Sequence, residues 1–417
     1  MKKNLFSLAI AFFALFTVAC LQEPNASSSS TTVSSLPFEQ TGVRFANPLG
    51  SEGVGNSNGY YYLQPLSDGN LNIKFIDYKT KQSIYLCSRI ECTHKDDTCT
   101  SFVASNGIIP AIIATEEKLY LVYGGINDSG TDYPKIVSLD LNGSNREQVF
   151  SYNQAAELGT LLSDGKYLYT IKTQVKQTGD TVGVSTELIK INLFTGEELS
   201  LLDLKGETAF IVDVVDSTFY IQTILQKEDA TSYTDIEMKY FTYNISTKES
   251  SDLFTTDPNT ERVVKFEKGT IYTIDIQSKT LSRSKSPDSE PQIICDRYTT
   301  KENVSGIYIP LIVDNYMMIN DIRNTGTDAV HDGTSVVNLT TGHVQDWPFT
   351  YELAGTNQSQ IVSIAAEHND SFLVVSGREP FTITYTTGDS FVMYSPKYAL
   401  ISKQDFWARN ANFEPVA

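Results

Sequence analysis

The chain has 417 residues, and its 50 Asp and Glu residues outnumber its 32 Lys and Arg residues, for a formal net charge of -18. This acidic balance argues against a nucleic-acid partner and against a polybasic grip on anionic lipid. Length alone suggests about three domains of ~150 residues, but an internal repeat predicts a single folded domain over residues 40–417.

The first element is an apolar segment that follows Lys2 and Lys3 and is too short for a comfortable membrane span. It is typical of a signal-peptide core. The segment ends in Thr17, Val18 and Ala19 before Cys20, which resembles the bacterial lipobox except that Thr17 stands where Leu is usual. We therefore expect a lipoprotein signal peptide over residues 1–19 and a lipid on Cys20. An ordinary cleaved signal peptide, with Cys20 incidental, is the alternative.

Residues 20–39 are rich in Ser and Thr and contain few apolar residues, which predicts a flexible tether. No later run approaches the ~18 apolar residues of a second membrane span. These features predict a protein held at the cell membrane by an N-terminal lipid, with its folded domain on the extracytoplasmic face.

A repeat of about fifty residues follows the tether, and each unit has a polar turn entering a strand of alternating aromatic and apolar residues. Its equivalent positions are Tyr62, Tyr120, Tyr169, Tyr220, Tyr272, Met318 and Leu373. Four strands per unit and seven units predict an all-β fold, a β-propeller of seven four-stranded blades. Six or eight blades are the alternatives, because residues 42–55 could complete the first blade or add a partial one. A large β-sandwich would not explain the regular period.

A second signature follows within five units, where Asp or Asn stands between apolar residues before a Thr-Gly, Thr-Lys or Asn-Gly turn. The segments are FIDYKTK, SLDLNGS, KINLFTGE, TYNISTKE and VNLTTGHV. Such turns require a positive φ, so each segment predicts a hairpin between two strands of one blade.

An insertion at residues 87–107 contains Cys87, Cys92, His94 and Cys99 in the spacing Cys-x4-Cys-x-His-x4-Cys. Three thiolates and one imidazole are the ligand set of a closed tetrahedral zinc site, so we predict a structural metal site there. A local disulfide such as Cys92 with Cys99 is the alternative in an exported protein, and unassigned thiols are a third.

The remaining cysteine, Cys295, ends the last predicted strand of the fifth unit. Cys87 ends the last strand of the first unit, so a closed ring would place the two on well-separated blades, beyond disulfide reach. We therefore expect Cys295 to be a lone thiol. Three thiols and a histidine then suit a metal better than one bridge with a leftover thiol.

The first unit resembles a segment of uncharacterised surface lipoproteins of Gram-positive bacteria, which have quinoprotein-type or YVTN-type propellers and the pattern YYYLxxxxxLxxFDYxTxxxxPLCxxxxCxHxxxxC. The matching residues are Tyr60, Tyr61, Tyr62, Leu71, Phe75, Asp77, Tyr78, Leu86, Cys87, Cys92, His94 and Cys99. Tyr85 departs from the pattern where the family often has Pro. The resemblance implies a propeller fold and a surface location, and no established activity.

Catalytic motifs are sparse. His331 and Asp332 lie in a predicted loop and are the candidates for acid–base chemistry, although a lone loop histidine is more often a solvated side chain.

Five long loops are predicted between the second and third strands of their units, on one face of the ring. They carry Tyr133, Tyr233, Phe381 and Tyr385, which would suit a glycan or a peptide. Tolerated insertions are the alternative.

These features favour a lipid-anchored binding or scaffolding protein of the cell envelope. The alternatives are a propeller lyase or hydrolase acting on a polysaccharide or peptide, and an assembly factor that binds an envelope protein.

Overall fold

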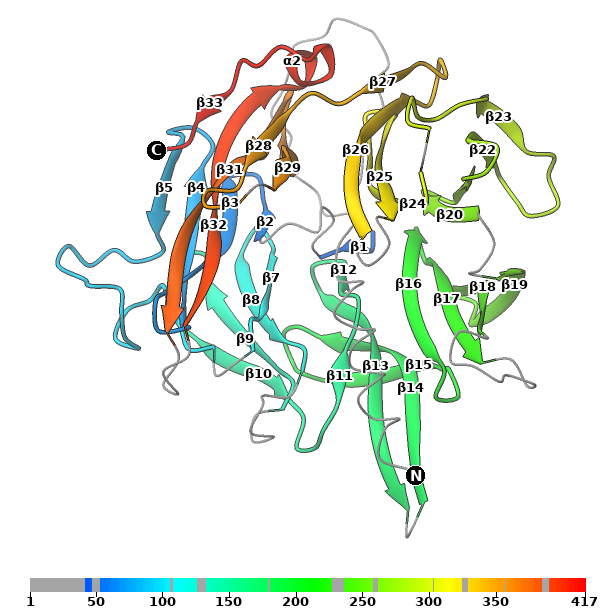
Figure 1. Cartoon of the computed structure of the whole chain (residues 1–417). Helices are drawn as coiled ribbons and strands as arrows, with labels where there is room; N and C mark the ends of the chain where they lie inside the picture. Colours follow the sequence, from blue (N-terminus) through cyan, green and yellow to red (C-terminus); the bar gives the residue numbers. More distant parts are fainter. Residues whose placement is uncertain are drawn as a thin grey trace, which may run out of the picture. The chain divides into compact units, whose positions relative to one another are not determined.

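The computed structural model describes residues 42–46, 53–105, 108–125, 133–178, 181–226, 236–257, 262–302, 304–324, 329–356, 358–384 and 390–417. Nearly all of their regular structure is β, arranged as the seven four-stranded blades of a β-propeller (Figure 1). The predicted fold class and blade number are therefore confirmed. Within this described part, no helix is long and apolar enough to cross a membrane.

The blades are formed by consecutive strands, with these bounds in chain order. The first three blades contain β2 (Gly53–Gly55), β3 (Gly59–Pro65), β4 (Leu71–Asp77) and β5 (Gln82–Tyr85); β7 (Ala111–Ala114), β8 (Lys118–Tyr123), β9 (Lys135–Asp140) and β10 (Glu147–Ser151); and β12 (Leu162–Ser163), β13 (Tyr167–Thr178), β14 (Thr181–Asn192) and β15 (Glu198–Asp203). The fourth and fifth contain β16 (Thr208–Val215), β17 (Thr218–Gln226), β18 (Ile236–Asn244) and β19 (Glu249–Thr256), then β20 (Arg262–Glu267), β21 (Thr270–Asp275), β22 (Thr280–Ser284) and β23 (Gln292–Cys295). The last two contain β24 (Gly306–Val313), β25 (Tyr316–Asn324), β26 (Ala329–Asn338) and β27 (Val344–Asp346), then β30 (Ser363–His368), β31 (Ser371–Thr384), β32 (Ser390–Ser402) and β33 (Glu414–Pro415).

The short elements outside these paths are β1 (Arg44–Phe45), β6 (Phe102–Val103), β11 (Glu157–Leu158), β28 (Thr350–Glu352), β29 (Ser359–Ile361) and helix α2 (Lys403–Ala408). Every aromatic strand of the repeat is the second strand of its blade, as predicted. The described chain forms two compact units, one spanning Phe210–Trp347 and the other combining Glu52–Ala209 with Pro348–Ala417.

The Asp or Asn of the second signature caps the turn between the third and fourth strands. In the first blade, Asp77 Oδ1 accepts hydrogen bonds from the backbone N–H groups of Lys79 (2.7 Å) and Thr80 (3.0 Å). Asn192, Asn244 and Asn338 make the same pair of contacts in their blades. The predicted positive φ follows in all five segments, at Lys81, Gly143, Gly196, Lys248 and Gly342. A short carboxylate or amide side chain therefore fixes the turn in four of the five hairpins.

Two of these turn glycines lie directly against the outer strand of the preceding blade. A Cβ atom on Gly196 would lie 2.1 Å from the carbonyl oxygen of Val149, and one on Gly342 would lie 2.2 Å from that of Ile294. No side chain fits at these distances, so glycine is required both by the positive φ and by the packing of neighbouring blades.

The segment with the uncertain role, residues 42–55, contributes to two blades. β2 pairs with β3 and completes the first blade, whereas β1 pairs with β12 at the edge of the third. No partial eighth blade is formed by the described residues of this segment.

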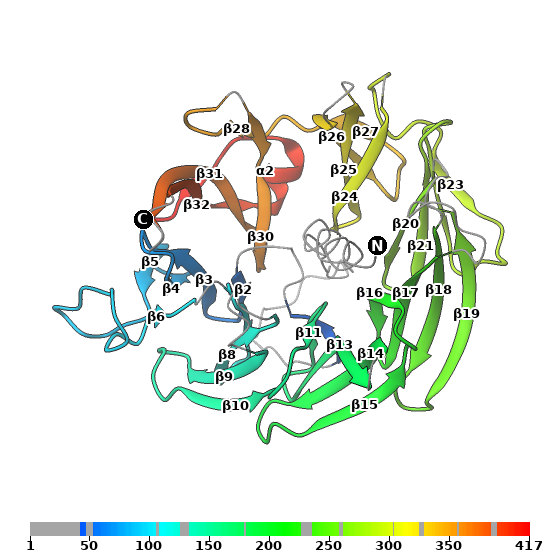
Figure 2. The same ribbon diagram turned by 60° about the horizontal axis from the view of Figure 1, so that its bottom comes forward.

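The first and last blades belong to the same compact unit and pack against each other (Figure 2). Tyr60 and Tyr62 of β3 contact Tyr398 of β32, with ring centroids 5.5 Å and 5.0 Å apart. The backbone of Ala417 adds two hydrogen bonds, donating to Lys81 O and accepting from Ser83 N–H. Among the described residues, side-chain packing and hydrogen bonds of the chain terminus join these blades.

Three predicted long loops are instead strand extensions. The β13–β14 ladder runs to the pair Thr178 and Thr181, β25–β26 to Asn324 and Ala329, and β31–β32 to Thr384 and Ser390. β-Branched and aromatic residues such as Val175, Val184, Ile383 and Phe391 continue through two of these ladders, β13–β14 and β31–β32, and favour extended backbone. His331 and Phe381, expected in loops, therefore lie in β26 and β31.

Candidate metal centre

The insertion lies between β5 and β6, and both of these strands pair with β4 of the first blade. β5 pairs with one end of β4 and β6 pairs with the other, so the loop between them projects from the outer edge of the blade (Figure 1). Leu86 and Val103 at the two ends of the loop are buried in the core cluster shared with the second blade. The stem of the loop is therefore fixed while its body is solvent-exposed.

The loop brings the four predicted ligands together. One ligand atom from each of Cys87, Cys92, His94 and Cys99 can be chosen so that all four lie within 4.8 Å of one another. A tetrahedral zinc ion with Zn–S bonds of about 2.3 Å needs ligand atoms about 3.8 Å apart. All three thiols are free, so the cluster can close around a metal by small side-chain movements.

A hydrogen bond to its carbonyl and a ring contact with its imidazole hold His94 in this position. Its backbone adopts the left-handed conformation (φ 57°), and its carbonyl accepts a hydrogen bond from Asn72 Nδ2 at 3.0 Å. Ser101 Oγ in turn donates to Asn72 Oδ1 at 2.8 Å, and both side chains are fully buried. The imidazole stacks on Tyr85 with ring centroids 4.1 Å apart and an interplanar angle of 14°. Tyr85 therefore supports a predicted metal ligand in this chain.

The surroundings of the cluster favour the thiolate form of Cys87. Burial acts to raise the pKa of Cys87, but a backbone hydrogen bond from Arg89 and side-chain hydrogen bonds from neighbouring groups outweigh it and lower that pKa to about 7. Burial raises the pKa of Cys99. Arg89 Nη2 lies 3.3 Å from Cys92 Sγ. Three thiolates and one divalent ion would carry a net charge of about −1, which this guanidinium would balance.

Arg146 clamps the end of the loop to the second blade. Its Nη1 donates to the carbonyl of Phe102 and its Nη2 to that of Thr100, both at 2.5 Å. Gly143 packs against the same backbone, since a Cβ there would lie 2.6 Å from Thr100 O. A metal in the cluster would therefore stiffen a segment that also contacts the neighbouring blade.

Among the described residues, the other predicted site residues do not come together in a site. Tyr133 is half-buried directly before β9, and Phe381 is half-buried on β31. Cys20, Tyr233 and Tyr385 lie outside the described residues, as do the side chains of His331 and Asp332.

Sequence reasoning missed the supporting residues Asn72, Ser101, Arg89 and Arg146. None belongs to a recognisable motif, and each is recognised only by its contact with the loop.

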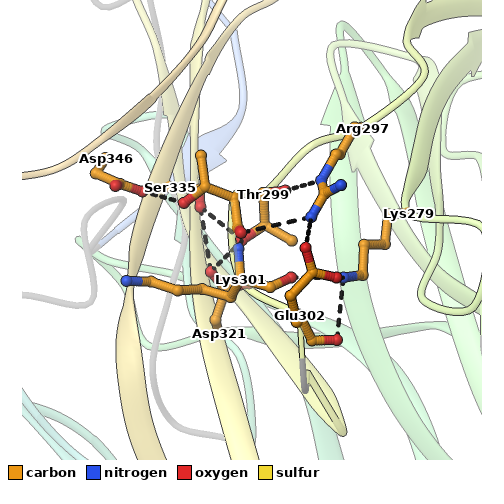
Figure 3. Close-up of polar contacts among 9 residues, drawn as sticks. Lys279, Arg297, Thr299, Lys301, Glu302, Asp321, Ser335 and Asp346 are labelled. Carbon is orange, nitrogen blue, oxygen red and sulfur yellow. Dashed lines mark hydrogen bonds and ion pairs between the residues drawn. The ribbon is translucent and has the colours of Figure 1, made fainter.

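A separate buried polar cluster lies in the unit Phe210–Trp347 (Figure 3). Asp321 is fully buried, and its Oδ2 accepts hydrogen bonds from Thr299 Oγ1 at 2.7 Å and from Ser335 Oγ at 3.1 Å. These residues come from the connection between β23 and β24 and from β25 and β26.

Lys279, which precedes β22, and Arg297, which lies within the connection between β23 and β24, also contact this connection (Figure 3). Lys279 Nζ donates to the carbonyls of Lys301 at 2.5 Å and Glu302 at 3.0 Å, and Arg297 pairs with the Glu302 carboxylate at 2.6 Å. The contacts of Thr299 with Asp321 and of Lys279 with the Lys301 carbonyl hold the connection to both the fifth and the sixth blade, so we call this cluster the structural latch.

No protein-family model matches the sequence, and no curated protein matches it. Among solved structures, a puromycin-hydrolyzing peptidase of Mycobacterium tuberculosis is similar at 11% identity and a TM-score of 0.51, with 95% of this chain and 56% of the peptidase covered. The chain thus spans little more than half the length of that protein.

Two further solved structures are similar over most of their own lengths. An oligogalacturonate lyase in complex with manganese matches at 13% identity and a TM-score of 0.43, covering 88% of this chain and 94% of the lyase. The β-propeller domain of the Trilobed protease from Pyrococcus furiosus matches at 9% identity and a TM-score of 0.47, covering 88% and 97%. The likeness to the peptidase concerns the fold alone and assigns no activity to this chain.

Proposed function

We propose that this protein is a lipid-anchored β-propeller on the extracytoplasmic face of the cell membrane, that it acts as a binding or scaffolding protein, and that its Cys3His cluster holds a structural zinc ion. The observation that carries the metal part is the convergence of Cys87, Cys92, His94 and Cys99 within 4.8 Å. Four protein ligands leave no open coordination position, which favours a structural role over a catalytic one.

The structural role follows from what the loop connects. Residues 86–101 contain little apolar side chain that could fold them, yet their two ends enter the core of the first blade. A zinc ion would join the segment after β5 to Cys99, which is 3% exposed. Small elements with too little core are commonly stabilised by such a metal.

The anchor is supported by the sequence of residues 1–39. A tether of about twenty residues has an r.m.s. length of roughly 25 Å, enough to separate the propeller from the lipid surface without fixing its orientation. The variant Cys20→Ala tests this part. We expect the wild-type protein in the detergent-soluble membrane fraction with a lipid-dependent mass increase, and the variant in the medium or soluble fraction without it. An unchanged distribution and mass would overturn the anchor.

Elemental analysis and thiol counting test the metal part, on the domain without Cys20 and purified without added metal. We expect about one zinc per chain, and all four cysteines reactive once the metal is chelated under denaturing conditions. No zinc with only two reactive thiols would reject the site in favour of a disulfide. Replacing Cys295 by Ser should leave the zinc content unchanged, because that residue lies on β23 of another blade.

A further inference from the structure

The fourth and fifth blades are poorly filled where they meet. Their shared apolar cluster has only three buried members among the described residues, Tyr240, Phe266 and Ile271. The clusters between the first and second, second and third, fifth and sixth, and seventh and first blades each contain ten or more buried residues. Because protein interiors are normally close-packed, such an interface leaves open space.

A pocket of about 390 Å³ occupies this space and lies within the single unit Phe210–Trp347. Its volume is in the usual range for sites that bind small molecules. The lining comes from the end of β19, from one face of β20, β21 and β22, and from the loop before β23. We call it the blade-interface pocket.

The face of the fifth blade explains the chemistry of the pocket. Alternation along β20 and β21 directs Arg262, Val264, Ile271 and Thr273 to the same side, because Arg262 pairs with Asp275 and Val264 pairs with Thr273. Phe254 closes the floor from β19 and contacts the rings of Tyr240 and Phe266 beneath it. The floor is therefore aromatic and aliphatic.

The rim of the pocket is polar and nearly balanced in charge. Hydroxyl groups are supplied by Thr255, Thr256, Thr273, Ser284 and Ser289. The charged groups are Arg262, whose Nε lies 3.4 Å from Asp275 Oδ2, and Asp257. The Arg262 guanidinium is paired with Asp275, and Asp257 adds a second carboxylate to the lining, so the pocket has no surplus positive charge for an anionic ligand. An uncharged ligand with an apolar substituent and several hydroxyl groups fits this lining best.

We propose that the blade-interface pocket binds an N-acetylated hexosamine, alone or as a short oligomer, with the acetyl methyl on the Phe254 floor and the sugar hydroxyls on the Thr and Ser rim. Thr273 lies at the centre of the lining, between Val264 and Ser282 in the sheet register. This inference rests on the proposed role as a binding protein and does not depend on the zinc site, which lies in the other compact unit.

The test is a titration of zinc-loaded protein with N,N′-diacetylchitobiose, followed by calorimetry and ligand-observed NMR. Cellobiose, which lacks the acetamido groups, is the matched ligand, and we expect it to bind at least tenfold more weakly. Thr273→Phe fills the pocket and should weaken binding of the acetylated sugar at least tenfold. Thr270→Phe is the matched control, because Thr270 lies on the same strand but on the opposite face; it should bind as wild type.

Three results would overturn the proposal: no binding of the acetylated sugar by wild-type protein, equal binding of cellobiose, or undiminished binding by Thr273→Phe. If Thr273→Phe does not fold, Ser284→Phe takes its place with the same tenfold criterion, because Ser284 lines the pocket and pairs with Ile271 on the same face of the sheet. Zinc content and membrane fractionation are measured on the same preparations. Failure of the sugar titration with zinc present would thus reject only this pocket, whereas loss of zinc would concern the separate metal site.

Discussion

The substitution Cys99→Ser examines the metal site most directly. Cys99 is buried, its thiol lies 3.2 Å from His94 Nδ1 and 3.1 Å from Ser101 Oγ, and serine preserves the shape of the side chain. The matched control is Cys295→Ser, since Cys295 is a half-buried free thiol on another blade. The intrinsic effect of exchanging sulfur for oxygen should be about 1 kcal/mol at either position.

The additional effect at Cys99 is the loss of metal binding. At free zinc about 1,000-fold above the dissociation constant, binding only to the folded protein stabilises it by about 4 kcal/mol. At about 1.3 °C per kcal/mol for a domain of roughly 380 residues, Cys99→Ser should lower Tm by roughly 5 °C more than the control does. The loop is expected to affect global unfolding because its ends lie in the core of the first blade.

Differential scanning calorimetry with and without a zinc chelator measures this difference. With zinc, we expect wild type and Cys295→Ser to melt well above Cys99→Ser. With chelator, the three proteins should converge to within the intrinsic effect of the substitution. A wild-type Tm that does not respond to the chelator, or a difference that persists after chelation, would refute the reasoning.

Three further changes are predicted from the structure. Lys172→Met removes the nearly buried ammonium that lies 2.6 Å from the Glu198 carboxylate and leaves that carboxylate with only the hydrogen bond from Tyr152, so urea denaturation should show a loss of about 3 kcal/mol. Lys239→Met in an exposed pair should cost less than about 1 kcal/mol. Thr299→Val removes a donor from the buried Asp321 carboxylate and should lower the unfolding free energy by about 1–3 kcal/mol in the same assay, and no measurable loss would contradict the latch. Burial lowers the pKa of His368, which stacks on Tyr78, so the unfolded chain binds more protons and this residue's contribution to stability falls as pH drops through about 6.5; His368→Phe should flatten that part of a Tm-against-pH curve, and an unchanged slope would count against it.

Local sequence rules account for the repeating part of the fold. Alternation along each aromatic strand, an Asp or Asn before the turn, and a residue tolerant of positive φ after it are all properties of a few consecutive residues. They identified all seven second strands and five hairpins, four of them capped by Asp or Asn, down to the glycines at Gly196 and Gly342. The metal ligands were equally visible, because they fall within thirteen consecutive residues.

The sequence alone determined that this chain forms a propeller and which side chains are candidates for a metal. Only the tertiary structure decided how the loop is supported, through Asn72 on β4 and Arg146 in the second blade. It also decided that three expected loops continue as paired strands and that the fourth and fifth blades leave a pocket between them. The physical reason is that packing between blades joins residues far apart in the chain, whereas the repeat records only what each blade needs to fold its own strands.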